Sequence, residues 1–386
     1  MAVRMGQRLK LGCEDSIPGG ISVFDTQIRR RLWWQILFID GRAGQLSGQS
    51  VSFADKPCPP LPANVNDVDI NPTMTAMPPT HGGPTEMILC LARYEVGVFL
   101  YEHGTGLHDP KTPVSGKDEL IRLLESRLTE KYLKYCDPAV PLHILTAGGS
   151  RSVLHKLSMM AHHPAQYPDK GKSLPQSDHD SLFSHAIEMN SIHLLGYVEK
   201  AVEGFLWHID AYFQLDAFVF MLIESRAQPP TAPLTERAWN VTNDILEYRS
   251  ELTVDDGNEL HSSVRQLVAQ IWAAREAAAR RQRLAPPKPT PAISRLLEMV
   301  SRSQPGQKMG QLSASRLSDR VAHLSDGLSS DTTAVVTPDD SSSQVGDTGP
   351  GDFQYQASDE SFLQLDVTSW ENWGYWEDLL RGQPQY

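Results

Sequence analysis

The sequence predicts an all-α protein, an irregular multi-helix bundle followed by a disordered C-terminal region. Apolar residues recur at steps of three and four through most of residues 1–284, and no run alternates with period two between hairpin turns. After Arg283 the composition changes, because serine, threonine, aspartate and glycine replace the large apolar residues. About eight helices with apolar stripes would bury one another in such a bundle.

The first clear helix is predicted from Gln27 to Asp40, a stretch without proline or glycine. Asp25 and Thr26 could accept hydrogen bonds from the free amides at its start. Its first turn carries three cations that oppose the helix dipole, and a tryptophan pair follows them: Arg29, Arg30, Arg31, Trp33 and Trp34. We expect the arginines to have carboxylate partners elsewhere or to face water, and the tryptophans to be core anchors.

A proline-rich stretch separates this helix from the others. Between Asp40 and Thr85 the density of proline excludes regular helix, so we expect an extended path over the surface. Helical patterns then resume over residues 85–103, 117–136, 142–162 with an interruption at Gly148-Gly149, 181–227 with a break near Glu203-Gly204, 231–249 and 260–283.

The chain beyond residue 284 divides into two further parts. Residues 285–351 are predicted to be a disordered linker, because they cannot bury enough apolar surface to offset the entropy of ordering. A short helix over residues 293–303 could dock on the body or act alone.

The last part, residues 352–386, alternates aromatic and acidic residues. Acids keep aromatic side chains in water until a partner groove accepts them, so this composition is typical of an activation segment that binds coactivators. The alternative is a C-terminal helix docked on its own domain. The residues that we expect to carry activation are Phe362, Leu365, Trp370, Trp373, Trp376 and Leu379.

Composition limits the function classes. The net charge of −12 and the pI near 5.5 argue against DNA binding by this chain alone, since such domains present a basic patch. The four cysteines are scattered without paired spacing, which indicates neither a disulfide framework nor a metal cluster. No apolar run reaches ~18 residues, so the sequence predicts no membrane span.

The segment from Arg29 to Asp40, with its Leu-Trp-Trp, resembles the middle homology region of fungal zinc binuclear cluster transcription factors. Ser47-Gly48 and the prolines from Pro57 to Pro62 continue the resemblance, which extends over most of residues 1–284; Ser50 stands where the family usually has proline. The family-motif residues are Arg29, Arg30, Arg31, Trp33, Trp34, Asp40 and Gly48.

The resemblance implies a nuclear transcriptional regulator of RNA polymerase II genes, such as a metabolic gene cluster, and not an enzyme. It implies coactivator partners, a homodimer, and DNA contact only through an N-terminal module of six cysteines that is absent here. Zinc is expected only in that missing cluster, so no cofactor is expected in this chain. We expect the sequence to begin partway into the middle region.

An all-α enzyme or small-molecule-binding protein is the alternative. Asn243, Glu247 and Glu251 resemble the magnesium motif of terpene cyclases, but Glu247 replaces a hydroxyl and no aspartate-rich partner helix is present. His155, His162 and His163 lack cysteine or glutamate at ligand spacing, which favours surface or capping roles.

Overall fold

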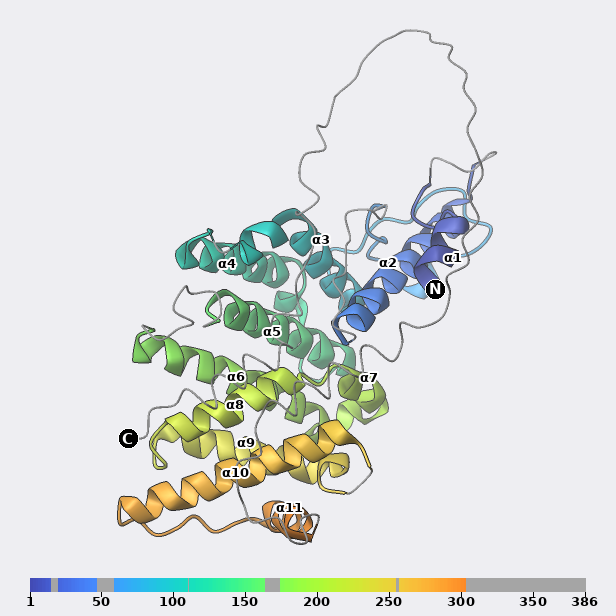
Figure 1. The fold of residues 1–386 in the computed structure, drawn as a ribbon. Helices are drawn as coiled ribbons and strands as arrows, with labels where there is room; N and C mark the ends of the chain where they lie inside the picture. The colour runs from blue at the N-terminus through green and yellow to red at the C-terminus, as the bar shows by residue number, and fades with distance from the viewer. Residues whose placement is uncertain (15–19, 47–58, 110, 164–173, 255–256, 303–386) are drawn as a thin grey trace, which may run out of the picture.

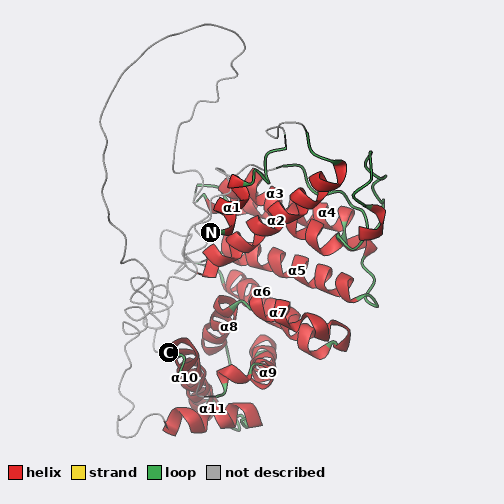
Figure 2. Cartoon of the chain, turned by 90° about the vertical axis from the view of Figure 1, so that its right-hand side faces the viewer, coloured by secondary structure: helices red, strands yellow, loops and turns green. Residues whose placement is uncertain are grey.

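The computed structural model describes residues 1–14, 20–46, 59–109, 111–163, 174–254 and 257–302, and within these ranges it contains helices and no strand (Figures 1 and 2). The prediction of an all-α fold is confirmed. Short 3-10 turns lie at η1 (Asp67–Asp69), η2 (Leu133–Tyr135), η4 (Lys200–Phe205) and η5 (Ser250–Leu252). The α-helices are α1 (Ala2–Arg8), α2 (Val23–Leu46), α3 (Ile88–His108), α4 (Val114–Lys131), α5 (Pro141–Ala161), α6 (Gln176–Val198), α7 (Leu206–Ala211), α8 (Leu215–Ala227), α9 (Pro233–Tyr248), α10 (Glu259–Arg281) and α11 (Pro291–Arg302).

The helices are stacked in approximate chain order from α3 and α4 at one end to α11 at the other (Figure 1). α6 lies in the middle of the stack and packs on α5, α8 and α9. α1 and α2 lie beside α3, at the end of the stack remote from α11 (Figure 1).

The main core surrounds α8. All residues from Ala217 to Ser225 are buried, so this helix is enclosed on every side rather than along one stripe. α6, α9 and α10 enclose it, and they contribute Phe183, Ile245 and Ile271 to the same core.

α5 is continuous, and the predicted interruption at Gly148-Gly149 is wrong. A Cβ atom at Gly148 would lie 3.5 Å from Cγ2 of Ile192, so this side of α5 lies close against α6. Each glycine lowers helix propensity by about 1 kcal/mol relative to alanine, and the packing of α5 between α3, α4 and α6 outweighs that cost.

The long apolar stretch of residues 181–227 breaks twice rather than once. α6 ends at Val198, where Glu199 accepts a hydrogen bond from the amide of Ala201 and begins η4. A second break separates α7 from α8 at residues 212–214. The single break predicted near Glu203-Gly204 therefore falls inside η4.

The helical body continues beyond residue 284, the position after which the sequence predicts a linker. α11 docks with Ala292, Ile293 and Leu296 buried against α9 and α10. Arg295 adds an ion pair to Glu247 at 2.9 Å. The predicted short helix is confirmed and it docks on the body, whereas the rest of the predicted linker and residues 352–386 lie outside the described residues.

Candidate functional site

Ser22 caps the start of α2, the helix that carries the arginine-tryptophan segment. The Ser22 hydroxyl accepts a hydrogen bond from the amide of Asp25 at 3.0 Å and donates to the Asp25 carboxylate at 2.7 Å. Asp25 and Thr26 lie inside the first turn, so the prediction that they cap the helix is wrong. α2 also passes Asp40 and two glycines before it ends at Leu46.

Two of the three arginines have the carboxylate partners that the sequence predicts. Arg30 binds both oxygens of Glu14, at 2.5 and 2.8 Å, and Arg31 binds Asp67 at 2.5 Å. The hydrogen bond from Arg30 is the main cause that holds the pKa of Glu14 below its usual value. These pairs join α2 to the loop that precedes it and to η1, which follows it in the sequence.

Arg29 binds main-chain carbonyls instead of a carboxylate. Its guanidinium donates to the carbonyl oxygens of Leu9 at 2.5 Å and Lys10 at 2.9 Å, just after the end of α1. The last carbonyls of a helix have no partners within it and carry partial negative charge, so a cation is favourable there. Arg29 therefore caps α1.

The tryptophans are core anchors, as predicted. Trp33 is 0% exposed and Trp34 5%. Trp34 stacks on Tyr94 with ring centroids 5.6 Å apart, and its indole nitrogen donates to the carbonyl of Pro60 at 3.4 Å. Their neighbours form what we call the N-terminal cluster: Leu11, Trp33, Trp34, Leu37, Met87, Leu91 and Tyr94.

Trp33 leaves no room for a side chain at residue 6 of α1. A Cβ atom at Gly6 would lie 2.7 Å from Cζ3 of Trp33, which is closer than such contacts allow. Gly6 thus lets α1 approach the indole ring directly. Of the other family-motif residues, Asp40 lies half-buried on α2, and Gly48 lies outside the described residues.

Arg42, near the end of α2, joins this helix to the end of α7. Its guanidinium donates to the carbonyl of Ala211 at 2.9 and 3.1 Å and to that of Phe213 at 3.3 Å, at the end of α7. It also lies 5.3 Å from the centre of the Tyr212 ring. The bonded carbonyls are about 170 residues away, so no local pattern indicates them.

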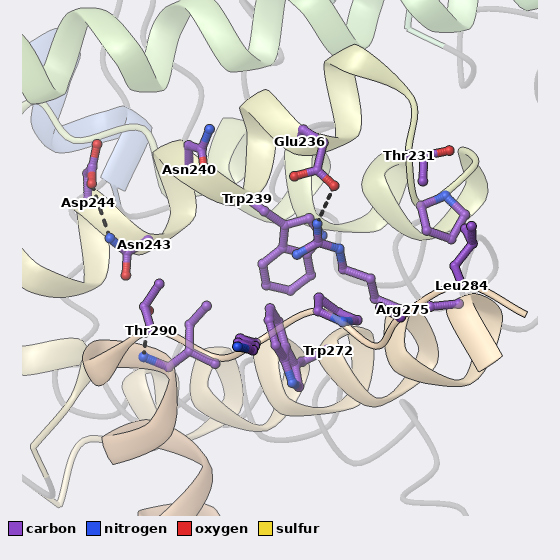
Figure 3. A pocket seen from close by; sticks show the side chains of 16 residues that line it. Thr231, Glu236, Trp239, Asn240, Asn243, Asp244, Trp272, Arg275, Leu284 and Thr290 are labelled. Carbon is purple, nitrogen blue, oxygen red and sulfur yellow. Dashed lines mark hydrogen bonds and ion pairs between the residues drawn. The ribbon is translucent and has the colours of Figure 1, made fainter.

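A cavity of about 560 Å³ lies between α9, α10 and the segment that leads to α11 (Figure 3). Trp239 and Trp272 meet edge to face inside it, with centroids 5.0 Å apart. Arg275 lies over both rings, 5.2 and 5.4 Å from their centres, and pairs with Glu236 at 2.7 Å.

Three buried polar atoms around this cavity have no hydrogen-bond partner among the described residues. They are two donors, Nε1 of Trp239 and Nε of Arg275, and one acceptor, Oδ1 of Asn243. Buried polar groups normally have a partner in the protein or in ordered water. The cavity can therefore hold a small polar molecule or water.

The side chains of the terpene-cyclase-like motif do not point into one common site. Asn243 lines the cavity, but Glu247 pairs with Arg295, and Glu251 lies past the end of α9, where it pairs with Arg249 at 2.7 Å. Across the described ranges, no group of three or more histidine, cysteine, aspartate or glutamate side chains could hold a metal ion.

The three candidate metal ligands His155, His162 and His163 have different partners in the structure. Nδ1 of His155 lies 2.8 Å from Nδ1 of His185, so one ring donates to the other, and His162 contacts Asp118 at 2.8 Å. His163 is buried. Burial lowers the pKa of both His163 and His185 to about 4. The arrangement favours structural roles for these residues.

A second cavity, of about 520 Å³, is largely apolar and lies where α2 meets the body. Phe38 of α2, Arg93 of α3 and Tyr212 after α7 are among the residues that line it. The six residues predicted to carry activation, from Phe362 to Leu379, lie outside the described residues, so the structure places none of them.

In the described part of the chain, no single helix is both long and apolar enough to cross a membrane. Only residues 200–211 together with α8 meet the length and composition requirements, and that pair is bent by 85°. α8 is the most deeply buried helix of the body.

Several fungal regulators are similar to this chain. The aurofusarin cluster transcription factor of Gibberella zeae is 30% identical over 306 residues, which cover 77% of this chain and 45% of that protein. The transcriptional regulator AacuB of Aspergillus aculeatus is 28% identical over 75% of this chain and 40% of its own length. A C6 finger domain transcription factor of Aspergillus niger is 26% identical over 71% of this chain and 38% of its own length.

The chain spans less than half the length of these curated relatives. No family model matches it, and no solved structure matches it.

Proposed function

Because the chain is a homologue of fungal C6 zinc-finger-cluster transcription factors, we propose that it is a transcriptional regulator of fungal type. The observation that carries this proposal is the match of about three quarters of the chain to proteins named as transcription factors or regulators, two of them named for a gene cluster. It would act in the nucleus on genes transcribed by RNA polymerase II, within a metabolic gene cluster.

We propose that the helical body is a regulatory module and not the DNA-binding part. A net charge of −12 repels DNA, and the cysteines lack the paired spacing of a zinc cluster. The tryptophans of the arginine-tryptophan segment are buried, so they support the body rather than contact bases. DNA contact, and the need for zinc, would fall to a six-cysteine module outside this sequence. Assembly as a homodimer would match such a module to paired half-sites.

We further propose that residues 352–386 recruit coactivators. Trp370, Trp373 and Trp376 stand at three-residue steps, which would place them on one face of a short helix. Acidic residues alternate with them and with the neighbouring leucines, and no cation precedes Arg381 in this segment. An amphipathic helix of this kind fits a hydrophobic groove on a partner.

A reporter assay tests the segment. Residues 352–386 fused to a heterologous DNA-binding domain should activate transcription, and changing Trp370, Trp373 and Trp376 to alanine should abolish it. The matched control changes Ser361, Thr368 and Ser369 to alanine and should retain activity. A fusion that fails to activate, or that survives loss of the three tryptophans, would refute the activation role.

A transcript measurement in the fungus tests the regulatory role as a whole. Deleting the gene should lower the transcripts of a set of adjacent genes, and a fluorescent fusion of the protein should concentrate in the nucleus. Unchanged transcripts in the deletion strain, under conditions where the protein is made, would contradict the proposal.

A further inference from the structure

The cavity between α2 and the body has the size and character of a small-molecule site. Its volume of about 520 Å³ falls within the range of about 300–1,000 Å³ that is usual for such sites. Apolar side chains from several helices supply most of its wall, among them Phe38 of α2, Val96 of α3, Ile192 of α6 and Ile209 of α7. An apolar ligand could bury most of its surface here.

Arg93 is a cation in this largely apolar lining, and in the described part of the chain it has no ion-pair partner. Arg93 lies with its guanidinium carbon 4.3 Å from the centre of the Phe38 ring, and it donates to Nε2 of His208 at 3.3 Å and reaches Oε1 of Gln35 at 3.5 Å. Its buried Nε atom has no hydrogen-bond partner in the described ranges of the chain. Among the described residues, no carboxylate lies within ion-pair distance of Arg93, in contrast to Arg30 and Arg31 on α2.

The histidines around Arg93 do not supply negative charge. Burial, with the charge of Arg93 as a second cause, lowers the pKa of His208 to about 4, so this ring is neutral and accepts the bond from the guanidinium. His193 also lines the cavity, and its buried Nε2 has no hydrogen-bond partner in the part of the chain that the structure describes. Asp137 and Arg151 stand at the exposed part of the lining and carry opposite charges.

A half-buried guanidinium that has only neutral partners favours an anion, since a charge removed from water needs a countercharge. We propose that this cavity binds a small, largely apolar molecule that carries one anionic group, with the anion placed against Arg93 and the apolar part against the surrounding aromatic and aliphatic side chains. The site does not depend on the transcriptional role, and binding can be measured on the purified chain.

The position of the site also specifies what such a ligand would touch. Arg93 contacts Gln35 of α2 and His208 of α7. Phe38 of α2 packs against Tyr212, the residue after α7, and the Tyr212 ring also contacts His208. A bound anion would draw these groups together at the contact between the N-terminal cluster and the body. Occupancy should therefore slow amide exchange in α2 as well as in α7.

Two fluorescent probes of matched shape test the proposal on the full chain. The probe 8-anilinonaphthalene-1-sulfonate has an apolar ring system and one anionic group, and N-phenyl-1-naphthylamine has the same rings without the charge. In Arg93→Gln we expect the sulfonate to bind about tenfold more weakly, whereas the neutral probe should change less than twofold. The control Arg237→Gln removes an exposed cation on α9 and should leave both affinities unchanged.

A second variant tests whether the probes enter the cavity. Gly149 of α5 lines the cavity at its exposed edge, and a Cβ atom there meets nothing within 4 Å, so Gly149→Phe adds a ring at this edge without a backbone clash. Both probes should then bind at least fivefold more weakly, while the circular dichroism spectrum stays unchanged. Undiminished binding to Gly149→Phe, or equal losses of both probes in Arg93→Gln, would overturn the proposal.

Discussion

The N-terminal cluster and the main core are held together in different ways. The main core surrounds α8 with large apolar side chains on all sides. The N-terminal cluster is small and depends on two tryptophans, while the arginines of α2 bind Glu14, Asp67 and the end of α1 around it. Where little apolar area is available, directional polar contacts fix the orientation of a helix; where much is available, apolar burial supplies the stability.

The largest effect is expected in the main core. Phe218→Ala removes a ring that is 0% exposed in α8 and should lower the free energy of unfolding by about 3–5 kcal/mol. Because α6, α9 and α10 all pack on α8, we expect the whole body to unfold at a lower urea concentration. The control Leu195→Ala, at a side chain 58% exposed, should cost well under about 1 kcal/mol. Similar midpoints for both variants would contradict this description of the core.

Trp33→Ala should break the N-terminal cluster while the main core stays intact. The loss of an indole that is 0% exposed should cost about 3 kcal/mol, and the cavity left beside Gly6 should free α1. Hydrogen exchange should accelerate in α1 and α2 and stay unchanged in α8. Acceleration of the same size in α8 would show that the two regions unfold together.

Acid should weaken the main core before it weakens the N-terminal cluster. Burial lowers the pKa of His185 and His193 to about 4, so the unfolded chain takes up protons below about pH 6.5 and the folded chain only near pH 4. Stability present at neutral pH is therefore lost as the pH falls from 6.5 towards 4. Glu14 has a folded pKa below its usual value, so the contribution of its ion pair is lost only at lower pH, as the pH falls through that folded pKa.

Urea unfolding at pH 7 and pH 5 measures this difference. The wild-type chain should be less stable at pH 5, and His185→Gln should reduce that loss by about 1 kcal/mol. Equal stability of the wild-type chain at the two pH values would refute the role of the buried histidines.

The smallest effect is expected at the rim of the N-terminal cluster. Arg30→Gln removes a partly exposed ion pair to Glu14, and such pairs contribute at most about 1 kcal/mol. The thermal midpoint should shift by a few degrees at most, and the shift should shrink in high salt because the pair is screened. Glu14→Gln should give nearly the same shift, and a much larger shift in either variant would mean that the pair is essential to the cluster.

The sequence predicts the helices well where apolar spacing is regular. It predicts them less well where contacts with other helices determine whether a helix continues. The stripe of α9 and the burial of Trp33 and Trp34 follow from local pattern. The continuity of α5 does not, because Gly148-Gly149 is stabilised by contact with α6 rather than by its own propensity. The cap at Ser22 is a local signal, because its hydroxyl lies three residues before Asp25, but it places the start of α2 earlier than the predicted start at Gln27.

The two cavities could not be predicted from the sequence. Arg93 and His208 are 115 residues apart, and nothing around Arg93 in the sequence shows that its partners are neutral. Trp239 and Trp272 stand on two helices, and only the packing of α9 and α10 turns them into one aromatic wall. Long-range geometry carries this information, whereas helical periodicity does not.

α2 has a fixed length between its two arginine caps. Arg29 binds the end of α1 and Arg42 the end of α7, thirteen positions later on one unbroken helix, which amounts to roughly 20 Å along its axis and about 140° around it. The helix thus holds Arg29 and Arg42 at a fixed separation, on nearly opposite faces. Inserting or deleting a single residue between them would rotate one arginine by about 100° relative to the other. That arginine would then lose its contact with the carbonyls it binds. The length of this stretch is therefore fixed by the two contacts at its ends.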